Sequence, residues 1–455
     1  MCVSAAWATT FTVTNTNDSG PGSLRAAIEA ANANAGADEI VFADGVSGTI
    51  TLSSTLSKVT DPAGLTIDGG GDVTLHSIVA AHLFVVGQGA RLDLRNLTVS
   101  GGSPTSADQF GGLIFNEGGT LVVTDSTISG NSSSFNGGGI YNDEGGLVEV
   151  SGSTISDNWV DGWGGGIYNE QGGTVIVTDS TFHKNEAGDY GGGVFNRQGG
   201  KVEVTDSTFS GNHAADNGAG IANFGTLTVS GSTFSGNFGD FEGGGIYNEG
   251  EQLKVTNSTF FGNEGGFGGG GIVSYGGQVE VVNSTISNNT SFENGAGGIY
   301  GGLFTLRNTI VANHAGGNCG WSPALPPVVD GGYNVDDDGT CGFTQATGSL
   351  PNTDPLLDPA GLVDNGGPTK TIALQPESPA VDLVGQGACP PPATDQRAVE
   401  RPQGEACDSG AFELEQQATP KPPSVTSTSP KQTLPKLPLQ PTSGQPSLRR
   451  WIAPP

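Results

Sequence analysis

One loop of this chain carries oxygen-bearing side chains in an order that suits a metal ion. The stretch NVDDDGTCGF places Asn334, Asp336 and Asp338 at alternate positions before Gly339. Alternating oxygen ligands followed by a glycine turn can wrap around calcium. The Glu expected at the twelfth loop position is Gln345 instead. The pattern predicts calcium, the one cofactor expected, at Asn334, Asp336 and Asp338. An Asp-rich turn without metal is the alternative.

Aromatic side chains recur just before clusters of glycine. The clearest are Trp159, Trp163, Tyr190 and Phe241. Aromatic rings in one column can stack on sugar rings or dock a partner. We therefore predict that these four side chains contact a polysaccharide or a cell-surface glycan. The alternative is that the rings fold back and shield the glycines.

Acidic side chains also recur in these turns, and two carboxylates can act as the acid and base of a polysaccharide-cleaving enzyme. They are Asp157, Asp161, Asp189, Asp216 and Asp240. The five His share no motif, and the basic residues of the repeats are scattered. Repetition without a unique catalytic cluster favours a binding protein over an enzyme. The listed acids are where we place the alternative, a polysaccharide lyase or glycoside hydrolase.

These side chains are carried by two interleaved repeats. The first is GGGIYN and its variants, which begin at Gly137, Gly164, Gly191, Gly218 and Gly243. The second resembles DSTFSGN and ends at Asn131, Asn158, Asn185, Asn212, Asn237, Asn263 and Asn289. Successive asparagines are 25 to 27 residues apart, and such a fixed period is typical of a solenoid.

The repeat predicts an all-β, right-handed parallel β-helix. Stretches such as GGTVIVTDSTFHKN alternate apolar and polar residues, which predicts strands with Val175, Val177 and Phe182 facing inward. We expect each coil to read strand, turn, strand, turn. Buried amides are costly unless they are paired, so the recurring asparagines predict a structural ladder at Asn131, Asn158, Asn185, Asn212, Asn237 and Asn263.

The ends of the chain differ from the repeats. We predict a secretory-signal remnant in residues 1–8, an N-terminal cap and first coils in 9–102, regular coils in 103–317, a C-terminal cap in 318–415, and a disordered, basic, Pro-rich tail in 416–455. The N-terminal cap is a short helix with Leu24, Ala27, Ile28 and Ala31 on one side.

Four of the five cysteines follow the repeats. Their spacing suits two disulfides, Cys319 with Cys341 and Cys389 with Cys407, in an exported protein. Four unrelated thiols are the alternative, and the absence of a CxxC motif disfavours zinc.

The composition limits the partners. The chain has 46 acidic and 17 basic residues, and its formal net charge is -29. Binding to nucleic acid is therefore disfavoured. No run of 18 apolar residues exists, so no membrane-spanning helix is expected. We expect a monomer.

Several stretches resemble a known set of bacterial surface proteins. TVTNTNDSGPGSLRAAIEAANANAGADEIVF resembles their N-terminal signature, and the GGGIYN and FSGN pair is similar to the repeats of polymorphic outer membrane proteins. NTDPLLDPAGLVDNGGPTKTIALQPESPAVD and TDQRAVERPQGEACDSGAFE resemble the choice-of-anchor Q domain. The resemblance implies an exported, pectin-lyase-like β-helix held at the cell surface by an anchor that varies between members.

Together these patterns predict a secreted or cell-surface protein without enzymatic activity that adheres to glycan or to another surface. The alternatives are the polysaccharide-cleaving enzyme and a structural subunit of a surface layer or sheath.

Overall fold

The computed structural model describes residues 8–103, 111–293, 295–321, 326–385, 387–389 and 392–415. The described residues belong to one compact unit, which ends at Glu415. The predicted tail and all but the last residue of the predicted signal remnant lie outside them. Among the described residues, no helix has the length and apolar content needed to cross a membrane.

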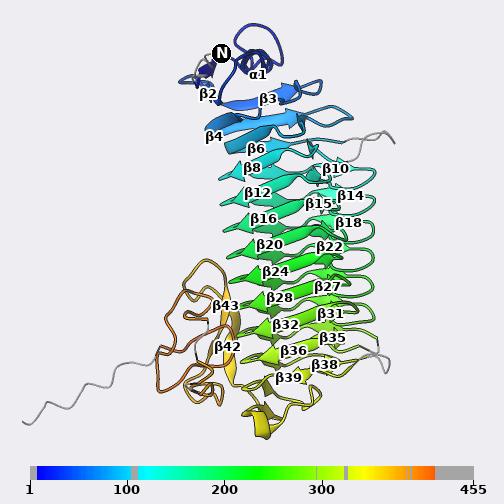
Figure 1. Cartoon of the computed structure of the whole chain (residues 1–455), viewed down its shortest axis with the longest axis vertical. Coiled ribbons are helices and arrows are strands. Elements are labelled where there is room, and N and C mark those ends of the chain that lie inside the picture. Colours follow the sequence, from blue (N-terminus) through cyan, green and yellow to red (C-terminus); the bar gives the residue numbers. More distant parts are fainter. Residues whose placement is uncertain are drawn as a thin grey trace, which may run out of the picture. The chain divides into compact units, whose positions relative to one another are not determined.

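Most of the chain forms the stacked coils of a parallel β-helix, as the repeat predicts (Figure 1). Three parallel sheets run along the stack. The ten-stranded sheet contains β5 (Phe84–Val86), β7 (Ile114–Asn116), β11 (Ile140–Asn142), β15 (Ile167–Asn169), β19 (Val194–Asn196), β23 (Ile221–Asn223), β27 (Ile246–Asn248), β31 (Ile272–Ser274), β35 (Ile299–Gly301) and β38 (Cys319–Gly320). The seven-stranded sheet contains β10 (Ser132–Ser133), β14 (Trp159–Val160), β18 (Glu186–Ala187), β22 (His213–Ala214), β26 (Phe238–Gly239), β30 (Glu264–Gly265) and β34 (Thr290–Ser291).

The third sheet has 24 strands and is called the long sheet here. It contains β1 (Thr10–Val13), β2 (Asp38–Phe42), β3 (Gly48–Leu52), β4 (Leu65–Ser77), β6 (Arg91–Ser100), β8 (Thr120–Thr124), β9 (Thr127–Ser129), β12 (Leu147–Ser151), β13 (Thr154–Ser156), β16 (Thr174–Thr178), β17 (Thr181–His183), β20 (Lys201–Thr205), β21 (Thr208–Ser210), β24 (Thr226–Ser230), β25 (Thr233–Ser235), β28 (Gln252–Thr256), β29 (Thr259–Phe261), β32 (Gln278–Val282), β33 (Thr285–Ser287), β36 (Phe304–Arg307), β37 (Ile310–Ala312), β39 (Val329–Asp330), β40 (Val335–Asp336) and β41 (Leu350–Pro351).

One regular coil contains four strands, so the expected order of strand, turn, strand, turn is wrong. In the coil that begins with β15, the five-residue β16 and the three-residue β17 are separated by a bend at Asp179, whose φ is 48°. Asp125, Asp206 and Asn257 adopt the same left-handed conformation in other coils. Asp and Asn tolerate this conformation better than most residues, so the bend interrupts a stretch that reads as one strand.

The interior of the stack is apolar, and the predicted inward residues lie there. Val175, Val177 and Phe182 are fully buried, which confirms their expected direction. Phe182 begins a column of stacked rings, with centroid distances of 4.6 Å to Phe209 and 4.9 Å from Phe209 to Phe234. Repetition of one residue type at one position therefore gives each coil the same packing partner above and below.

The asparagines at the ends of the FSGN repeats form one continuous set of hydrogen bonds inside the stack. Asn158 donates from Nδ2 to Asn185 Oδ1 at 2.9 Å, and Asn185 donates to Asn212 Oδ1 at 3.0 Å. From Asn158 onward, each Nδ2 also donates to a backbone carbonyl, as Asn185 does to Ile155 O at 2.9 Å. The same Asn-to-Asn bond links the members listed here: Asn131, Asn158, Asn185, Asn212, Asn237, Asn263 and Asn289. We call this set the asparagine ladder.

Two further polar columns join the coils. A second Asn column runs through Asn116, Asn142, Asn169, Asn196, Asn223 and Asn248, with Nδ2 to Oδ1 distances of 2.7–2.8 Å. Serine hydroxyls in the DST and GST triplets accept the backbone N–H of the preceding serine in the column, as Ser180 Oγ does from Ser153 N at 3.1 Å. The sequence analysis did not single out these serines. Buried polar groups are thus paired coil by coil.

The asparagine ladder ends on a histidine. Asn289 donates its backbone N–H to His314 Nδ1 at 3.0 Å, and the ring's Nε2 lies 3.0 Å from Ile286 O. The neutral ring with its proton on Nε2 can make both bonds. Burial lowers the pKa of His314 to about 4, although Asp337 and Asp338 act in the opposite direction.

We expect His314 to make the last coils sensitive to acid. Because the pKa of His314 in the folded protein lies below the usual histidine value of 6.5, the stability that the neutral ring contributes is complete above about pH 6.5 and is lost as pH falls towards 4. The hydrogen-exchange protection factors of residues 286–314, which correct for the intrinsic pH dependence of amide exchange, should therefore fall between pH 6.5 and 4 more in the wild type than in His314→Asn, whose amide does not titrate. An equal fall in both proteins would contradict this role.

The N-terminal end is covered by α1 (Leu24–Ala33), as the sequence predicts. Ser23 caps the helix by accepting the N–H of Ala26 at 3.2 Å. Leu24, Ala27, Ile28 and Ala31 are the buried residues of this helix. The helix therefore presents its apolar side to the first coils.

Residues 352–415, called the C-terminal segment, contact the outer side of the long sheet. They include the antiparallel pair β42 (Leu357–Val363) and β43 (Thr371–Leu374), which lies beside the coils in Figure 1. A short 3-10 helix, η1 (Gln345–Thr347), precedes the segment. Gln396 is buried and bridges two coils, because its Nε2 donates to Thr233 Oγ1 at 2.9 Å and its Oε1 accepts from Thr259 Oγ1 at 2.6 Å.

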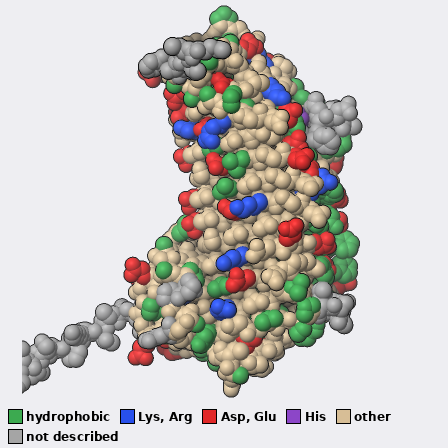
Figure 2. Space-filling view, viewed as in Figure 1, with side chains coloured by type: hydrophobic (Ala, Val, Ile, Leu, Met, Phe, Trp, Pro, Cys, Tyr) green, Lys and Arg blue, Asp and Glu red, His purple; other side chains and the backbone are tan. Residues whose placement is uncertain are grey.

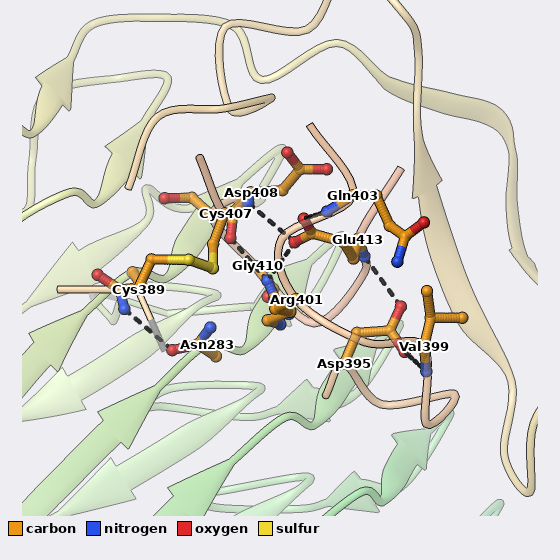
Figure 3. Close-up of polar contacts among 12 residues, drawn as sticks. Asn283, Cys389, Asp395, Val399, Arg401, Gln403, Cys407, Asp408, Gly410 and Glu413 are labelled. Carbon is orange, nitrogen blue, oxygen red and sulfur yellow. Dashed lines mark hydrogen bonds and ion pairs between the residues drawn. A yellow bond between two sulfur atoms is a disulfide. The ribbon is translucent and has the colours of Figure 1, made fainter. Parts of the chain in front are cut away.

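Two disulfides lie in this part of the chain, Cys319–Cys341 and Cys389–Cys407, in the expected pairing. The second lies beside a buried polar cluster (Figure 3). In that cluster, Arg401 pairs with Glu413 at 2.9 Å, and both side chains are fully buried. Arg401 also donates to the carbonyls of Asp408 and Gly410. Burial, followed by the charge of Glu413, raises the pKa of Asp408 to about 7.

Candidate functional site

A column of side chains on the outer face of the ten-stranded sheet forms the most distinctive surface of the coils. In each three-residue strand the first and third residues point inward, and the middle residue points outward. Strand register aligns these middle residues as Phe115, Tyr141, Tyr168, Phe195, Ala222, Tyr247, Val273 and Tyr300. We call this set the aromatic column. Its rings stack on one another, for example Tyr168 on Phe195 at 5.2 Å.

The aromatic column has a small residue at Ala222, and Trp163, Tyr190 and Phe224 pack against this part of the column. A cavity lies among these rings. The cavity measures about 330 Å³ and is lined by Trp163, Tyr190, Phe195, Arg197, Gln198 and Phe224. Trp163 stacks on Phe195 at 5.2 Å, and Tyr190 meets Phe224 edge-on at 5.7 Å. An apolar cavity with a few polar groups at its rim has the character of a site for a small ligand.

A polar network holds one wall of this cavity. Glu170 Oε2 accepts the hydroxyls of Tyr141 and Tyr168 at 3.2 and 3.1 Å, and its other oxygen pairs with Arg197 at 2.5 Å. Burial raises the pKa of both tyrosines. Burial alone would raise the pKa of Glu170, but hydrogen bonds from Gln171 and Tyr168 and the nearby Arg197 hold it below its usual value. Glu170 is therefore a carboxylate that fixes the rings and the arginine in place.

A second cavity adjoins the first. It measures about 430 Å³ and is lined by Gln198, Phe224, Glu249, Gly250, Glu251 and Gly277. The two cavities share Phe224 and Gln198. We call the two together the groove. One half of the groove is aromatic and the other half is acidic.

Of the four predicted glycan contacts, two line the groove. Trp163 and Tyr190 do, and their packing on the aromatic column also agrees with the shielding alternative. Trp159 lies on β14 of the seven-stranded sheet and is 40% exposed. Phe241 is 50% exposed and contacts Phe267 in a tilted arrangement, with 5.2 Å between the ring centroids. The structure therefore places Trp159 and Phe241 outside the groove.

The predicted acids fall into two places. Asp216 lies next to Asp189, since its N–H donates to Asp189 O at 2.9 Å, and its own carbonyl accepts the N–H of the residue after Asp240. Burial, and then the charges of Asp189 and Asp240, raise the pKa of Asp216. Asp240 also lies 3.1 Å from His213 Nε2. Asp161 lies at the equivalent turn of an earlier coil, and its N–H donates to Ser133 O. Asp157 occupies a left-handed bend at φ 53° before the asparagine ladder and belongs to a different turn.

The predicted calcium loop brings three consecutive carboxylates together. Oxygens of Asp336, Asp337 and Asp338 lie within 4.8 Å of one another. Asn334 does not join them, because its Nδ2 donates to Leu306 O and Asp330 at 2.9 Å and its Oδ1 accepts from Thr309 N. Asn318 donates to both Asp336 and Asp337 at 2.6 Å. Calcium binding here stays a prediction. In this structure Asp337, and not Asn334, lies close enough to Asp336 and Asp338 to be the third ligand.

Sequence reasoning missed much of the groove. Phe195 and Phe224 were not singled out, and Arg197 was counted among the scattered basic residues of the repeats. The usable signal was the variant GAGIANF at Gly218, which replaces the outward ring by Ala222 and adds Phe224. Only the register of the strands shows that Trp163 and Tyr190 of earlier coils cover that gap.

A comparison with known families supports the architecture. Residues 39–260 match the family model described as right handed beta helix region. The parallel coils are therefore those of a right-handed β-helix. No curated protein matches this sequence. Among solved structures, the chain is similar to one titled "Crystal structure of pectate lyase Pel9A", with 15% identity over 89% of this chain and 96% of that one and a TM-score of 0.40.

Proposed function

We propose that this chain is a non-enzymatic glycan-binding protein, exported or displayed at a cell surface, and that the groove is its binding site. The observation that carries the proposal is the aromatic cavity, where four aromatic side chains meet beside Arg197 and Gln198. Pyranose rings stack their C–H faces on aromatic rings, and amide or charged groups at the rim can bind hydroxyls. The two disulfides support an extracellular location.

The rigidity of the wall supports binding further. Tyr141, Tyr168 and Arg197 are all held by Glu170, so the ring of Phe195 packs on a fixed neighbour. A preformed site loses less conformational entropy on binding than a flexible one. The site therefore needs no large rearrangement to accept a sugar.

We expect Trp163→Ala and Tyr190→Ala to weaken glycan binding by about 10-fold each, because each removes a ring from the cavity wall. The matched control is Phe241→Ala, which removes an exposed ring outside the groove. The measurement is retention of the full-length protein on an array of neutral, acidic and basic polysaccharides, with calcium present. Equal loss of binding in Phe241→Ala would place the site elsewhere.

The same array separates binding from catalysis. A binding protein is retained without producing new reducing or unsaturated sugar ends. New ends that disappeared in Asp189→Asn and Asp216→Asn would instead support an enzyme whose site lies at Asp189, Asp216 and Asp240. These acids are the alternative because burial and mutual repulsion already raise the pKa of Asp216, as a general acid requires.

A further inference from the structure

The two halves of the groove differ in chemistry. Trp163, Tyr190 and Phe195 make the first half apolar, whereas Glu249 and Glu251 line the second. Phe224 and Gln198 border both halves, so one chain-like ligand can contact both. A ligand that fits must offer an apolar face and, next to it, groups that carry positive charge or donate hydrogen bonds to carboxylates.

The charge available to a ligand in the groove is negative. Arg197 is the basic residue among those that line it, and Glu170 pairs with Arg197 at 2.5 Å. Glu249 and Glu251 are exposed on the other side of Phe224. Figure 2 shows acidic side chains spread over the visible face, with Lys and Arg side chains among them. Residues 1–415 carry all 46 acidic residues of the chain and 12 of its 17 basic ones.

These features select among glycans. A polyuronide would bring carboxylates towards Glu249 and Glu251, and like charges in one site repel. A neutral glycan would use the rings and leave the acidic half without a charged partner. A hexosamine with a free amine offers a pyranose face for the rings and an ammonium group for the carboxylates. An ammonium group is also attracted to the face of an aromatic ring.

We propose that the groove binds glycans that carry protonated amines, namely de-N-acetylated hexosamine chains. This proposal rests on the glycan-binding function proposed above and adds the class of sugar. The rings of Trp163, Tyr190 and Phe224 hold the sugar face, and Glu249 and Glu251 hold the ammonium groups.

Three hexasaccharides with the same β-1,4 backbone test this proposal: glucosamine hexamer, N-acetylglucosamine hexamer and cellohexaose. Calorimetry with the full-length protein is carried out at about pH 5.5, where the amines of the glucosamine hexamer are charged. The glucosamine hexamer should bind about 10-fold more tightly than the other two, and added salt should remove most of that preference. In Glu249→Gln/Glu251→Gln the preference should fall to about 2-fold or less.

The matched control is Glu29→Gln/Glu39→Gln, which makes the same change in net charge at exposed positions near the N-terminal end. This control should keep the preference. Equal binding of all three hexamers, without salt dependence, would overturn the amine proposal and leave glycan binding intact. If none of the three hexamers bound, the result would count against both the amine proposal and the glycan-binding function. Equal binding of a six-lysine peptide, unaffected by Trp163→Ala, would show that charge alone is recognised and would also overturn the proposal.

Discussion

Replacing Glu413 by Gln is expected to weaken the attachment of the C-terminal segment by about 3–5 kcal/mol. The Glu413 carboxylate accepts three hydrogen bonds at 2.9 Å, from Arg401 Nη1, Asp408 N and Gln403 N. A Gln side chain offers one oxygen and turns an NH₂ group towards a donor. Arg401 would also stay buried without its counterion, which is the costly outcome for a buried ion pair.

The measurement is hydrogen exchange of residues 352–415 together with urea denaturation. Glu415→Gln is the matched control, because Glu415 is 66% exposed and its ion pair with Arg397 is 3.6 Å long. An exposed pair of this kind contributes at most about 1 kcal/mol. The double variant Arg401→Met/Glu413→Leu should recover only the part of the loss that comes from the unpaired Arg401 charge, since the N–H groups of Asp408 and Gln403 still lose their acceptor. Similar effects of Glu413→Gln and Glu415→Gln would contradict a structural role for the buried pair.

Replacing Asn185 by Ala is expected to cost about 4 kcal/mol. Asn185 Oδ1 accepts both the backbone N–H and the Nδ2 of Asn158, and its own Nδ2 donates to Ile155 O and Asn212 Oδ1. The substitution leaves several buried polar groups unpaired, and each unsatisfied group costs about 1–3 kcal/mol. A cavity in the ladder adds to this cost.

Asn131→Ala is the matched control at the first rung of the asparagine ladder. Asn131 Oδ1 accepts from Gly102 N, and its Nδ2 donates to Asn158 Oδ1, so fewer bonds are lost there. Urea denaturation should show roughly half the effect of Asn185→Ala. Hydrogen exchange should place the damage in coils next to the substitution, because coils contact only their neighbours. Equal losses of stability at both positions would show that an interior asparagine of the ladder contributes no more to stability than the first one.

Periodic features of this chain could be predicted, because a residue type that recurs at a fixed interval must occupy the same position in every coil. The asparagines at 25 to 27 residue intervals indicated coils of that length, and the alternation in GGTVIVTDSTFHKN indicated which side of a strand is buried. The helix over Leu24–Ala33 followed from its own apolar spacing. The bends at Asp125 and Asp179 were missed because the stretch around each was interpreted as one strand, although the repeat carries only Asp, Gly or Asn at this position.

Aperiodic contacts could not be predicted in this way. Gln396 meets Thr259 across 137 residues, and no repeat in the sequence connects the two. The groove was missed for a related reason, because it arises where the repeat fails at Ala222. The acids and rings that sequence analysis could name belong to several columns, and only the register of the strands separates those columns.

The equal spacing of the first coils bears on how such a chain can change in evolution. Asn131, Asn158, Asn185 and Asn212 are each 27 residues apart, and their bonds to the next coil are alike. An in-frame duplication or deletion of 27 codons in this stretch would join equivalent residues. The asparagine ladder and the other polar columns would stay continuous. From Thr233 onward, the C-terminal segment bonds Thr233, Thr259 and Thr285 on three successive coils. Recombination can therefore lengthen or shorten the N-terminal half one coil at a time, while the C-terminal half is inherited as a unit.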